Sequence, residues 1–484
     1  MSIPPAVPAP TETGAGLPAP EVLALLEGLR AQDPPTHGGR VLSYVYDPDD
    51  AALDELAARA VELFLPVNGL DPTTFRSVAA VERDLVGFAR GVLHGDDDVV
   101  GSVTSGGTES CLLAVKSARD LWRAADPARA HARPRLVAPT TAHPAFHKAA
   151  AYLDLDLVSV PVDPAAGTVD PDRLLAEVDD RTALVVVSAP SYPFGVLDPV
   201  DRVAAGASER GVPCHVDACL GGWVLPWWRS EGEDPLPAWD FAVPGVTSVS
   251  ADLHKYGYAP KGASVVLYRG RERHRAQYFV TSAWPGYPVV NPTVLGSRGA
   301  GPMAAAWAIT RALGTDGLAA LAARTRRATD ALVEAAVQVE GLRVVGRPDG
   351  PLVALATDET VTADRRVDPF RLVDAVRRRG FLLQAQPALV QGDGTVLPRT
   401  VHLTVTPVTG RVADDLTAAL RAGADEVRGL APAAPDPDLA QQVLADGLPE
   451  DLAVVMATLE ALPAELKHPV LAEVLAAAID PSRG

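Results

Sequence analysis

Short apolar runs alternate with helix-like segments along the middle of this chain. The runs cover residues 99–104, 135–139, 157–163, 183–190, 214–218, 243–249 and 264–269. Between them, apolar residues recur at the spacing that places them on one face of a helix. Continuous apolar strands that alternate with helices are typical of a parallel sheet covered on both faces. The pattern therefore predicts an α/β domain with a parallel or mostly parallel sheet.

Helical spacing also dominates the segments on either side of this region. It covers 21–30, 52–65 and 77–94, and a long helix is expected at 317–340. A stretch rich in Pro and Ala at 429–438 is typical of a linker. We predict five segments: a mobile Pro/Ala arm (1–20), an N-terminal helical segment (21–95), a large domain (96–316), a linking helix with a small C-terminal αβ domain (317–430), and a helical tail (438–484).

The composition disfavours several kinds of partner. The 484 residues carry a net charge of -18, so no basic surface is expected to recruit nucleic acid or an anionic membrane. The N-terminus lacks the charged and apolar regions of a signal peptide, and the apolar runs are too short to span a bilayer. We therefore expect no integral membrane segment and a cytoplasmic location. Of the three cysteines, Cys111, Cys214 and Cys219, the last two cannot form a metal quartet alone, and we predict neither a metal nor a disulfide framework.

Lys255 lies in the stretch SVSADLHKYGYAPKG (248–262), which joins two apolar runs. A lysine on such a loop is held in place, and we expect it to be short of carboxylate neighbours. Desolvation lowers the pKa of a lysine, and the neutral amine can form a Schiff base with an aldehyde. For an isolated lysine, a side chain that snorkels at a strand end is the alternative interpretation.

Three other strand ends carry residues suited to the same chemistry. A helix start preceded by glycines favours a phosphate, and here it contains Ser105, Gly106, Gly107 and Thr108. Asp217 ends a buried strand and needs a cationic partner, which the protonated pyridine nitrogen of pyridoxal phosphate (PLP) can supply. His143 follows another strand and could stack on a planar ring. Taken singly, each has another interpretation: an N-cap for Thr108, a capping role for Asp217, and a helix-start or surface position for His143. Their arrangement together with Lys255 predicts a PLP site.

Six stretches resemble a known enzyme family. They are TSGGTES (104–110), TAHPAFHKAA (141–150), SAPSYPFGVLDPV (188–200), HVDACLGG (215–222), SADLHKYGYAPKG (250–262) and GSRGAGPMAAAWA (296–308). In these stretches the chain resembles fold-type I PLP enzymes of the group II decarboxylase superfamily, and most closely the sphingosine phosphate lyases. The resemblance implies an aspartate aminotransferase-like large domain with a mostly parallel seven-stranded sheet, and a small C-terminal αβ domain.

The resemblance also implies roles for individual residues. Lys255 would bind PLP as a Schiff base, Asp217 would pair with the pyridine nitrogen, His143 would stack on the ring, and Cys219 would pack against its other face. The cofactor phosphate would be held by Ser105, Gly106, Gly107, Thr108 and His254. Gly296 and Ser297 would complete that phosphate site from the neighbouring subunit of a homodimer with shared active sites.

The residues expected to bind the substrate depart from the family at one position. In the lyases a tyrosine, a histidine and a lysine hold the substrate phosphate; Tyr46 and Lys261 match the first and third, whereas Asp71 stands in place of the histidine. A carboxylate about 4 Å from a phosphate would repel it by about 4 kcal/mol at an effective dielectric constant near 20. Asp71 could instead pair with Lys261, or be a turn residue before Pro72.

We therefore predict a PLP-dependent carbon–carbon lyase that cleaves the Cα–Cβ bond of a small-molecule β-hydroxy amine. The alternative is an amino-acid decarboxylase on the same scaffold, with Arg298 or Lys261 as the cation for the substrate carboxylate. A catalytically silent PLP-fold protein is a third hypothesis, which the presence of all the cofactor residues opposes. Lys255, His143, Tyr256 or Tyr258 could move protons.

Overall fold

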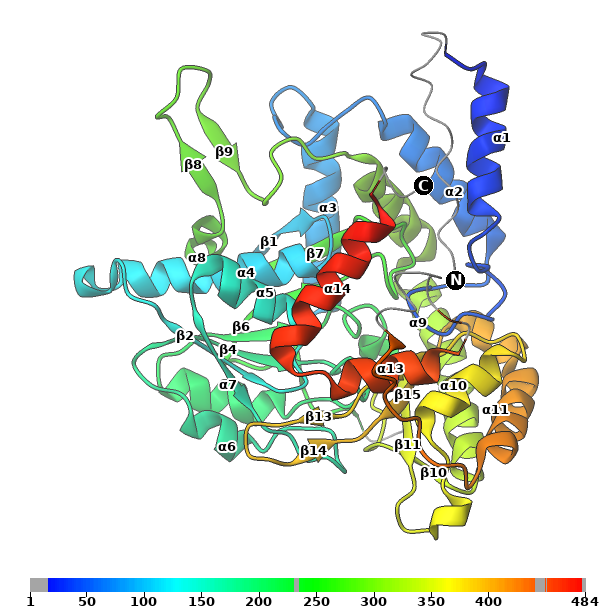
Figure 1. Ribbon diagram of the computed structural model, residues 1–484. Helices are drawn as coiled ribbons and strands as arrows, with labels where there is room; N and C mark the ends of the chain where they lie inside the picture. Colours follow the sequence, from blue (N-terminus) through cyan, green and yellow to red (C-terminus); the bar gives the residue numbers. More distant parts are fainter. Residues whose placement is uncertain (1–15, 230–234, 440–448, 450, 481–484) are drawn as a thin grey trace.

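The computed structural model describes residues 16–229, 235–439, 449 and 451–480. Its central feature is a seven-stranded sheet with the strand order β1-β7-β6-β5-β4-β2-β3 (Figure 1). β7 runs antiparallel to its neighbours β1 and β6, and the other strands pair in parallel. The strands are β1 (Val99–Thr104), β2 (Arg135–Pro139), β3 (Asp156–Val160), β4 (Thr182–Ser188), β5 (Cys214–Asp217), β6 (Val246–Ala251) and β7 (Ser264–Arg269). The predicted mostly parallel α/β sheet is confirmed.

Helices cover both faces of this sheet, and strand β4 shows why its sequence is apolar throughout. Leu184 and Val186 pack in a cluster with α4 and α5, whereas Val185 and Val187 pack in the cluster that contains α3, α7 and α9. Alternate side chains of a strand point to opposite faces, so a strand buried on both sides needs apolar residues at every position. The helices are α3 (Arg76–Val92), α4 (Gly107–Ala124), α5 (Pro144–Leu153), α7 (Val200–Glu209) and α9 (Gly301–Val337).

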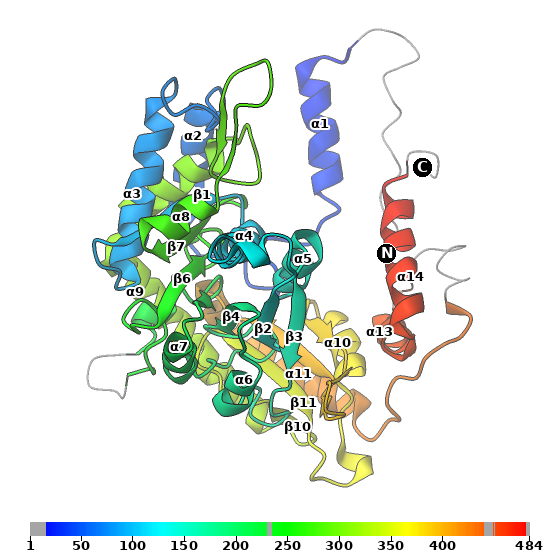
Figure 2. The same ribbon diagram turned by 90° about the vertical axis from the view of Figure 1, so that its left-hand side faces the viewer.

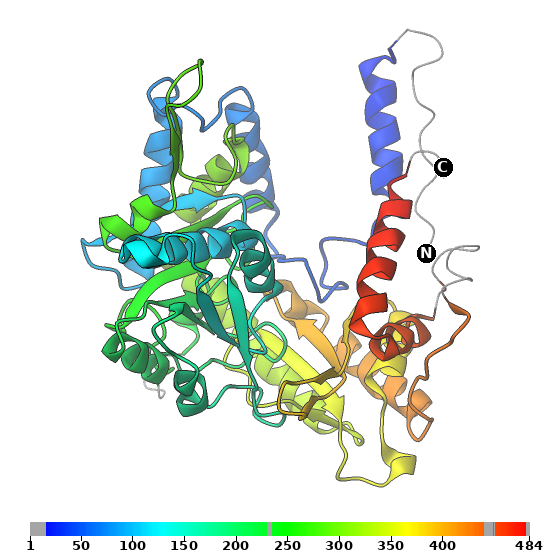
Figure 3. The same ribbon diagram turned by 60° about the vertical axis from the view of Figure 1, so that its left-hand side comes forward.

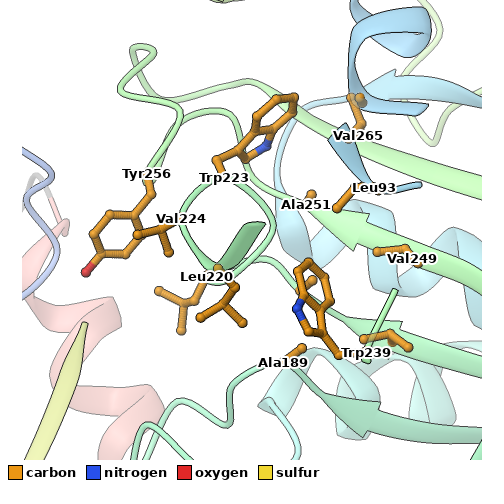
Figure 4. Packing of buried hydrophobic residues seen from close by; sticks show 14 of the residues in the cluster. Leu93, Ala189, Leu220, Trp223, Val224, Trp239, Val249, Ala251, Tyr256 and Val265 are labelled. Atoms are coloured by element: carbon orange, nitrogen blue, oxygen red, sulfur yellow. The ribbon is translucent and has the colours of Figure 1, made fainter. Parts of the chain in front are cut away.

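Large aromatic side chains fill the second of these clusters. Trp223, Trp239 and Tyr256 are all buried and lie among the valines and alanines of β6 and its neighbours (Figure 4). Trp223 also stacks on Phe88 of α3, with ring centroids 5.8 Å apart. The Trp-rich segment after β5 therefore anchors the loop that follows the strand, which positions the carboxyl end of β5.

A second sheet forms the small C-terminal unit, with its own apolar core. Its strand order is β10-β11-β15-β12, all antiparallel, and α10 and α11 pack against it. Val41, from the N-terminal part of the chain, bridges to Leu382 beside this sheet. The predicted helix at 317–340 belongs to α9, which begins earlier and is kinked at Gly314, where φ is 57°. The elements are β10 (Leu342–Val344), β11 (Leu352–Thr357), β12 (Gln384–Gln386), β15 (Thr400–Thr404), α10 (Pro369–Arg377) and α11 (Ala413–Val427).

The remaining elements lie at the periphery. Figure 2 and Figure 3 show α1 standing apart from α2 and α3, and none of its residues is buried. The described part of the chain contains no helix long and apolar enough to cross a membrane. The elements are α1 (Ala19–Arg30), α2 (Ala51–Phe64), α6 (Pro171–Ala176), α8 (Arg271–Ala276), α13 (Leu452–Ala461), α14 (Ala464–Ala478), β8 (Phe279–Thr281), β9 (Val289–Asn291), β13 (Leu389–Val390), β14 (Val396–Leu397), and the short 3-10 helices η2 (Pro127–Arg129), η3 (Leu225–Trp227), η4 (Ala363–Arg365) and η5 (Pro407–Arg411).

The five predicted segments remain a prediction, because parts of the first and last are not described. Residues 1–15 of the Pro/Ala arm lie outside the described residues, as do 440–448, 450 and 481–484 of the tail. The described part of the tail contains α13 and α14.

Candidate active site

The carboxyl ends of β1, β2, β4, β5 and β6 meet at one edge of the large sheet around a cavity of about 350 Å³. Ligands of open α/β sheets bind at this edge. Gly296 and Ser297, which follow β9, do not line the cavity of their own chain. The other residues predicted to bind the cofactor all line it: Ser105, Gly106, Gly107, Thr108, His143, Asp217, Cys219, His254 and Lys255.

The glycine-rich turn after β1 places the start of α4 directly against the cavity. Glu109 holds this turn, because its carboxylate accepts hydrogen bonds from the backbone N–H groups of Ser105 at 2.6 Å and Val294 at 2.7 Å. A Cβ atom on Gly107 would lie 2.7 Å from both the Asp252 Oδ2 and the Cys219 Sγ, so a larger residue does not fit. The first N–H groups of a helix and its dipole favour an anion, and this turn could therefore hold a phosphate.

Asp217 ends β5 as a buried carboxylate that lacks a cationic partner. Its Oδ1 accepts hydrogen bonds from the Cys219 N–H at 3.1 Å and the Ser250 hydroxyl at 3.4 Å. Within the described chain, no lysine, arginine or histidine lies at ion-pair distance from Asp217. A buried carboxylate is costly without a cation, so the geometry fits a cationic ligand such as a protonated pyridine ring.

Lys255 lies beside a carboxylate, and here our expectation from the sequence was wrong. Its Nζ is 3.0 Å from the Oδ2 of Asp252, which follows the last residue of β6 and is 2% exposed. Burial is the strongest single effect and would lower the pKa of Lys255, but Asp252, together with smaller contributions from Cys219, Tyr46 and Asp217, raises this pKa above its usual value. Burial likewise favours a higher pKa for Asp252, yet Lys255 and His254 hold it well below its usual value. Without the cofactor, Lys255 is therefore a paired cation.

His143 presents a neutral ring to the cavity. It is the N-cap of α5, and its Nδ1 accepts a hydrogen bond from the Ala145 N–H at 3.2 Å. The ring proton therefore lies on Nε2. Burial lowers the pKa of His143, although the charge of Asp217 partly opposes this effect. A neutral, fixed ring at this position could stack on a planar cofactor.

Tyr46 and Lys261 lie together close to Lys255. The Lys261 Nζ lies over the Tyr46 ring, 4.6 Å from its centroid. Burial and, to a smaller extent, the charge of Lys255 lower the pKa of Lys261 to about 8, against the opposing effect of Asp252. Burial also raises the pKa of Tyr46 to about 12. The pair could hold an anionic group of a substrate through one cation and one hydroxyl.

Asp71 lies in an exposed turn, away from the cavity that contains Lys255. Its carboxylate accepts hydrogen bonds from the Thr73 N–H at 2.8 Å and from the hydroxyls of Thr73 and Thr74 at 2.7 and 2.8 Å. The Thr73 hydroxyl is the first of the causes that lower the pKa of Asp71 to about 2. Asp71 lines a separate cavity of about 730 Å³ together with Arg298. Within one chain, Asp71 thus forms a turn and does not pair with Lys261.

The sequence did not single out several residues that line the cavity. Asp252 is contained in the stretch 250–262, but its role depends on the turn that brings it back to Lys255. Tyr192 also lines the cavity; its hydroxyl donates to the side-chain oxygen of Gln384, and its ring lies 4.4 Å from that of His402. These partners are too distant in the chain for any local pattern to reveal them.

Two tyrosines considered as proton carriers face elsewhere. The Tyr256 hydroxyl points away from the packed cluster and donates to the Val405 carbonyl at 2.8 Å (Figure 4). Tyr258 is buried, and this burial raises the pKa of its hydroxyl. Neither side chain lines the cavity.

PLP combines a phosphate, a cationic ring and an aldehyde in one molecule. The groups at this edge of the sheet suit all three: the turn before α4 suits the phosphate, Asp217 the ring and Lys255 the aldehyde. They define a PLP-dependent enzyme of fold type I. The sequence profile of the pyridoxal-dependent decarboxylase conserved domain matches residues 78–356. The chain therefore belongs to the pyridoxal-dependent decarboxylase family, uses PLP and is a lyase.

Similar proteins of known name indicate which members of the family this chain resembles. The chain is 36% identical over 420 residues to the sphingosine-1-phosphate lyase of Drosophila melanogaster, which covers 85% of this chain and 72% of the fly protein. It is 36% identical over 352 residues to the Dictyostelium discoideum sphingosine-1-phosphate lyase, covering 73% of this chain and 62% of that protein. The chain thus spans less than two thirds of the Dictyostelium protein.

Solved structures agree on the fold. The sphingosine-1-phosphate lyase of Burkholderia pseudomallei superposes with a TM-score of 0.78 at 34% identity, covering 86% of this chain and 92% of that chain. A Lactobacillus brevis glutamate decarboxylase superposes with a TM-score of 0.75 at 21% identity, covering 88% of this chain and 96% of that chain. The second likeness concerns the fold alone.

Proposed function

We propose that this chain is an aldehyde-lyase that cleaves the Cα–Cβ bond of a phosphorylated β-hydroxy amine, with a phosphorylated sphingoid base as the substrate class. The observation that carries the proposal is the position of Lys261 over Tyr46, beside Lys255. A phosphate needs a cation, and Lys261 has no ion-pair partner in the described chain. The sphingosine-1-phosphate lyases to which this chain is similar are named for a substrate of this class.

We assign the cofactor contacts as follows. Lys255 would bind the aldehyde carbon, Asp217 would face the ring nitrogen, His143 would stack on one face of the ring and Cys219 would pack against the other. PLP supplies, when bound, an electron sink for the charge that develops when a bond to Cα breaks. The phosphate contacts are Ser105, Gly106, Gly107, Thr108 and His254, with Gly296 and Ser297 from a second subunit.

Two of these side chains can hold or move a proton. The Lys255 amine, once free of the cofactor, lies 3.0 Å from the Asp252 carboxylate, which favours its protonated form. The His143 Nε2–H is neutral and fixed by the backbone bond at Nδ1. We propose that Lys255 takes the proton from the substrate hydroxyl while its amine is neutral, because the nearby Asp252 carboxylate stabilises the ammonium that results.

The decarboxylase alternative needs a cation for a substrate carboxylate. Arg298 does not serve, because its guanidinium pairs with Glu82 and donates to the Val103 carbonyl at 2.6 Å. Lys261 remains the candidate cation for this alternative too, and only the products separate the two reactions.

We further propose a homodimer in the cytoplasm. The hairpin β8–β9 and the segment after it expose large apolar residues, among them Val280, Trp284 and Tyr287, as a subunit interface requires. Ser297 lies in this same exposed region, outside the cavity of its own chain. The three cysteines are free and buried, which suits a reducing compartment.

Product analysis tests the proposed reaction. The purified chain, loaded with PLP, is given phosphorylated sphingoid bases, their unphosphorylated forms and ordinary amino acids, with Lys255→Ala as the blank. We expect a long-chain aldehyde from the phosphorylated bases that depends on Lys255. Carbon dioxide from an amino acid, without any aldehyde, would make the enzyme a decarboxylase and refute the proposal.

A further inference from the structure

Two cysteines distant in sequence meet beside Asp217 at the base of the cavity. Cys111 lies on α4 and Cys219 follows β5; they are 1% and 6% exposed, and their sulfur atoms lie within 4.8 Å of each other. Both sulfur atoms contact the Ser250 hydroxyl, at 3.9 and 3.3 Å, as does the Asp217 Oδ1 at 3.4 Å. In the function proposed above, Cys219 only packs against the cofactor ring, and neither thiol takes part in the chemistry.

The three potential ligand atoms have the spacing of a metal site. The two sulfurs and one carboxylate oxygen of Asp217 all lie within 4.8 Å of one another. Tetrahedral zinc with bonds of about 2.3 Å to sulfur places two thiolates about 3.8 Å apart. The three residues lie on a helix, at the end of a strand and directly after it, and all of them line the cavity. A fourth position can therefore be taken by solvent.

The charge of the site also favours a bound cation, independently of the thiols. Asp217 is a buried carboxylate at 7% exposure, and the described chain places no cationic side chain at ion-pair distance from it. The neighbouring carboxylate, Asp252, is already paired with Lys255. The cavity without PLP thus has one buried negative charge that a cation would neutralise.

We propose that, when PLP is absent, Cys111, Cys219 and Asp217 bind a thiophilic divalent ion such as zinc, and that this ion and the cofactor exclude each other. Both need the Asp217 carboxylate, and the ion occupies the space of the pyridine ring. Binding converts two thiols to thiolates and releases their protons to solvent, so affinity rises with pH. Metal occupancy then limits how fast newly folded chains take up PLP.

Cobalt is a spectroscopic probe for this site. The full-length chain, in a phosphine reductant, is titrated with Co²⁺ both as the PLP form and after PLP is removed with hydroxylamine. We expect the PLP-free chain to bind one cobalt ion, to show thiolate-to-cobalt charge-transfer absorbance and to release about two protons per ion. We expect the PLP form to show none of these changes. Absence of the charge-transfer band in the PLP-free chain, or an equal band in the PLP form, overturns the proposal.

Matched variants identify the ligands. Cys111→Ser and Cys219→Ser should each weaken cobalt binding by at least about tenfold. The control is Cys214→Ser, the third buried cysteine, which should bind cobalt as the wild type does. Circular dichroism verifies that each variant folds. Unchanged affinity in both Cys111→Ser and Cys219→Ser overturns the assignment.

Competition between zinc and PLP can also be measured on the wild-type chain. The PLP-free protein is saturated with zinc and mixed with PLP, and the return of the absorbance of lysine-bound PLP is timed. At free zinc about ten times its dissociation constant, only about a tenth of the chains are open to PLP, so we expect the return to slow about tenfold and a chelator to restore it. An unchanged rate with zinc bound shows that the ion lies elsewhere and refutes mutual exclusion.

Discussion

Lys261→Gln should separate binding of the substrate phosphate from the chemistry at Cα. The change removes one cation and keeps a polar side chain over the Tyr46 ring. A hydrogen bond to a charged group contributes about 1.5–3 kcal/mol, which corresponds to a loss of about 10- to 150-fold in kcat/KM for a phosphorylated base. The unphosphorylated base, which makes no such contact, should lose less than about twofold by the same reasoning.

The pH dependence gives a second measure of the same contact. Because burial lowers the pKa of Lys261 to about 8, the cation is present below that pH and is lost above it. In the wild type, kcat/KM for the phosphorylated base should therefore fall above about pH 8, and this fall should be absent in Lys261→Gln.

The assay is aldehyde release from both bases across this pH range, with Lys261→Arg as the variant that keeps the charge. Lys261→Arg should retain the preference for the phosphorylated base and move the fall in activity to higher pH. An equal loss on both bases in Lys261→Gln would mean that Lys261 supports the fold of the cavity, and would refute the assignment.

Three further changes test the site and the core. Gly107→Ala should lower the free energy of unfolding by about 1–3 kcal/mol in chemical denaturation, because its Cβ would lie 2.7 Å from Asp252, whereas Gly87→Ala on α3, with open space around it, should not lower it. Asp252→Asn should lower the pKa of Lys255, because the charge that opposes the effect of burial is removed. The pH midpoint for the reaction of Lys255 with PLP, followed by absorbance, should therefore move to lower pH. An unchanged midpoint would contradict this. Burial raises the pKa of Asp198 to about 7, so the folded chain keeps a proton that an unfolded aspartate loses near pH 4. The free energy of unfolding should therefore fall as pH rises from about 4 to about 7. Asp198→Asn, compared with the wild type by denaturation at several pH values, should remove this fall.

The strand ends could be predicted from the sequence because the signals there are local. The run that becomes β5 ends in Asp217, and the run that becomes β6 leads to Lys255 within a few residues. Parallel strands bring such ends to one edge whatever the details of the connections, so the cofactor cavity follows from strand order alone. The same logic explains why the fold class could be predicted and confirmed.

The contacts that tune these residues could not be predicted, because each depends on the shape of a turn or on a distant segment. The Lys255–Asp252 pair arises from the turn after β6, where both side chains fold back to the same side. Cys111 meets Cys219 only because α4 packs in the same cluster as the segment that follows β5. Periodicity gives the faces of helices and strands, but not which side chains touch across them.

The residues predicted to bind the substrate illustrate the same limit. A residue-by-residue match placed Asp71 beside a phosphate, where a second negative charge would oppose binding. The structure uses this carboxylate to close its own turn, through Thr73 and Thr74, and leaves Lys261 without an anionic partner in the described chain. Since a turn-closing aspartate no longer repels the ligand, the cation and Tyr46 alone can determine which anion is accepted. Under the proposed function, specificity for a phosphorylated substrate would therefore depend on Lys261 having no anionic partner in the described chain, and not on the number of charges in the motif.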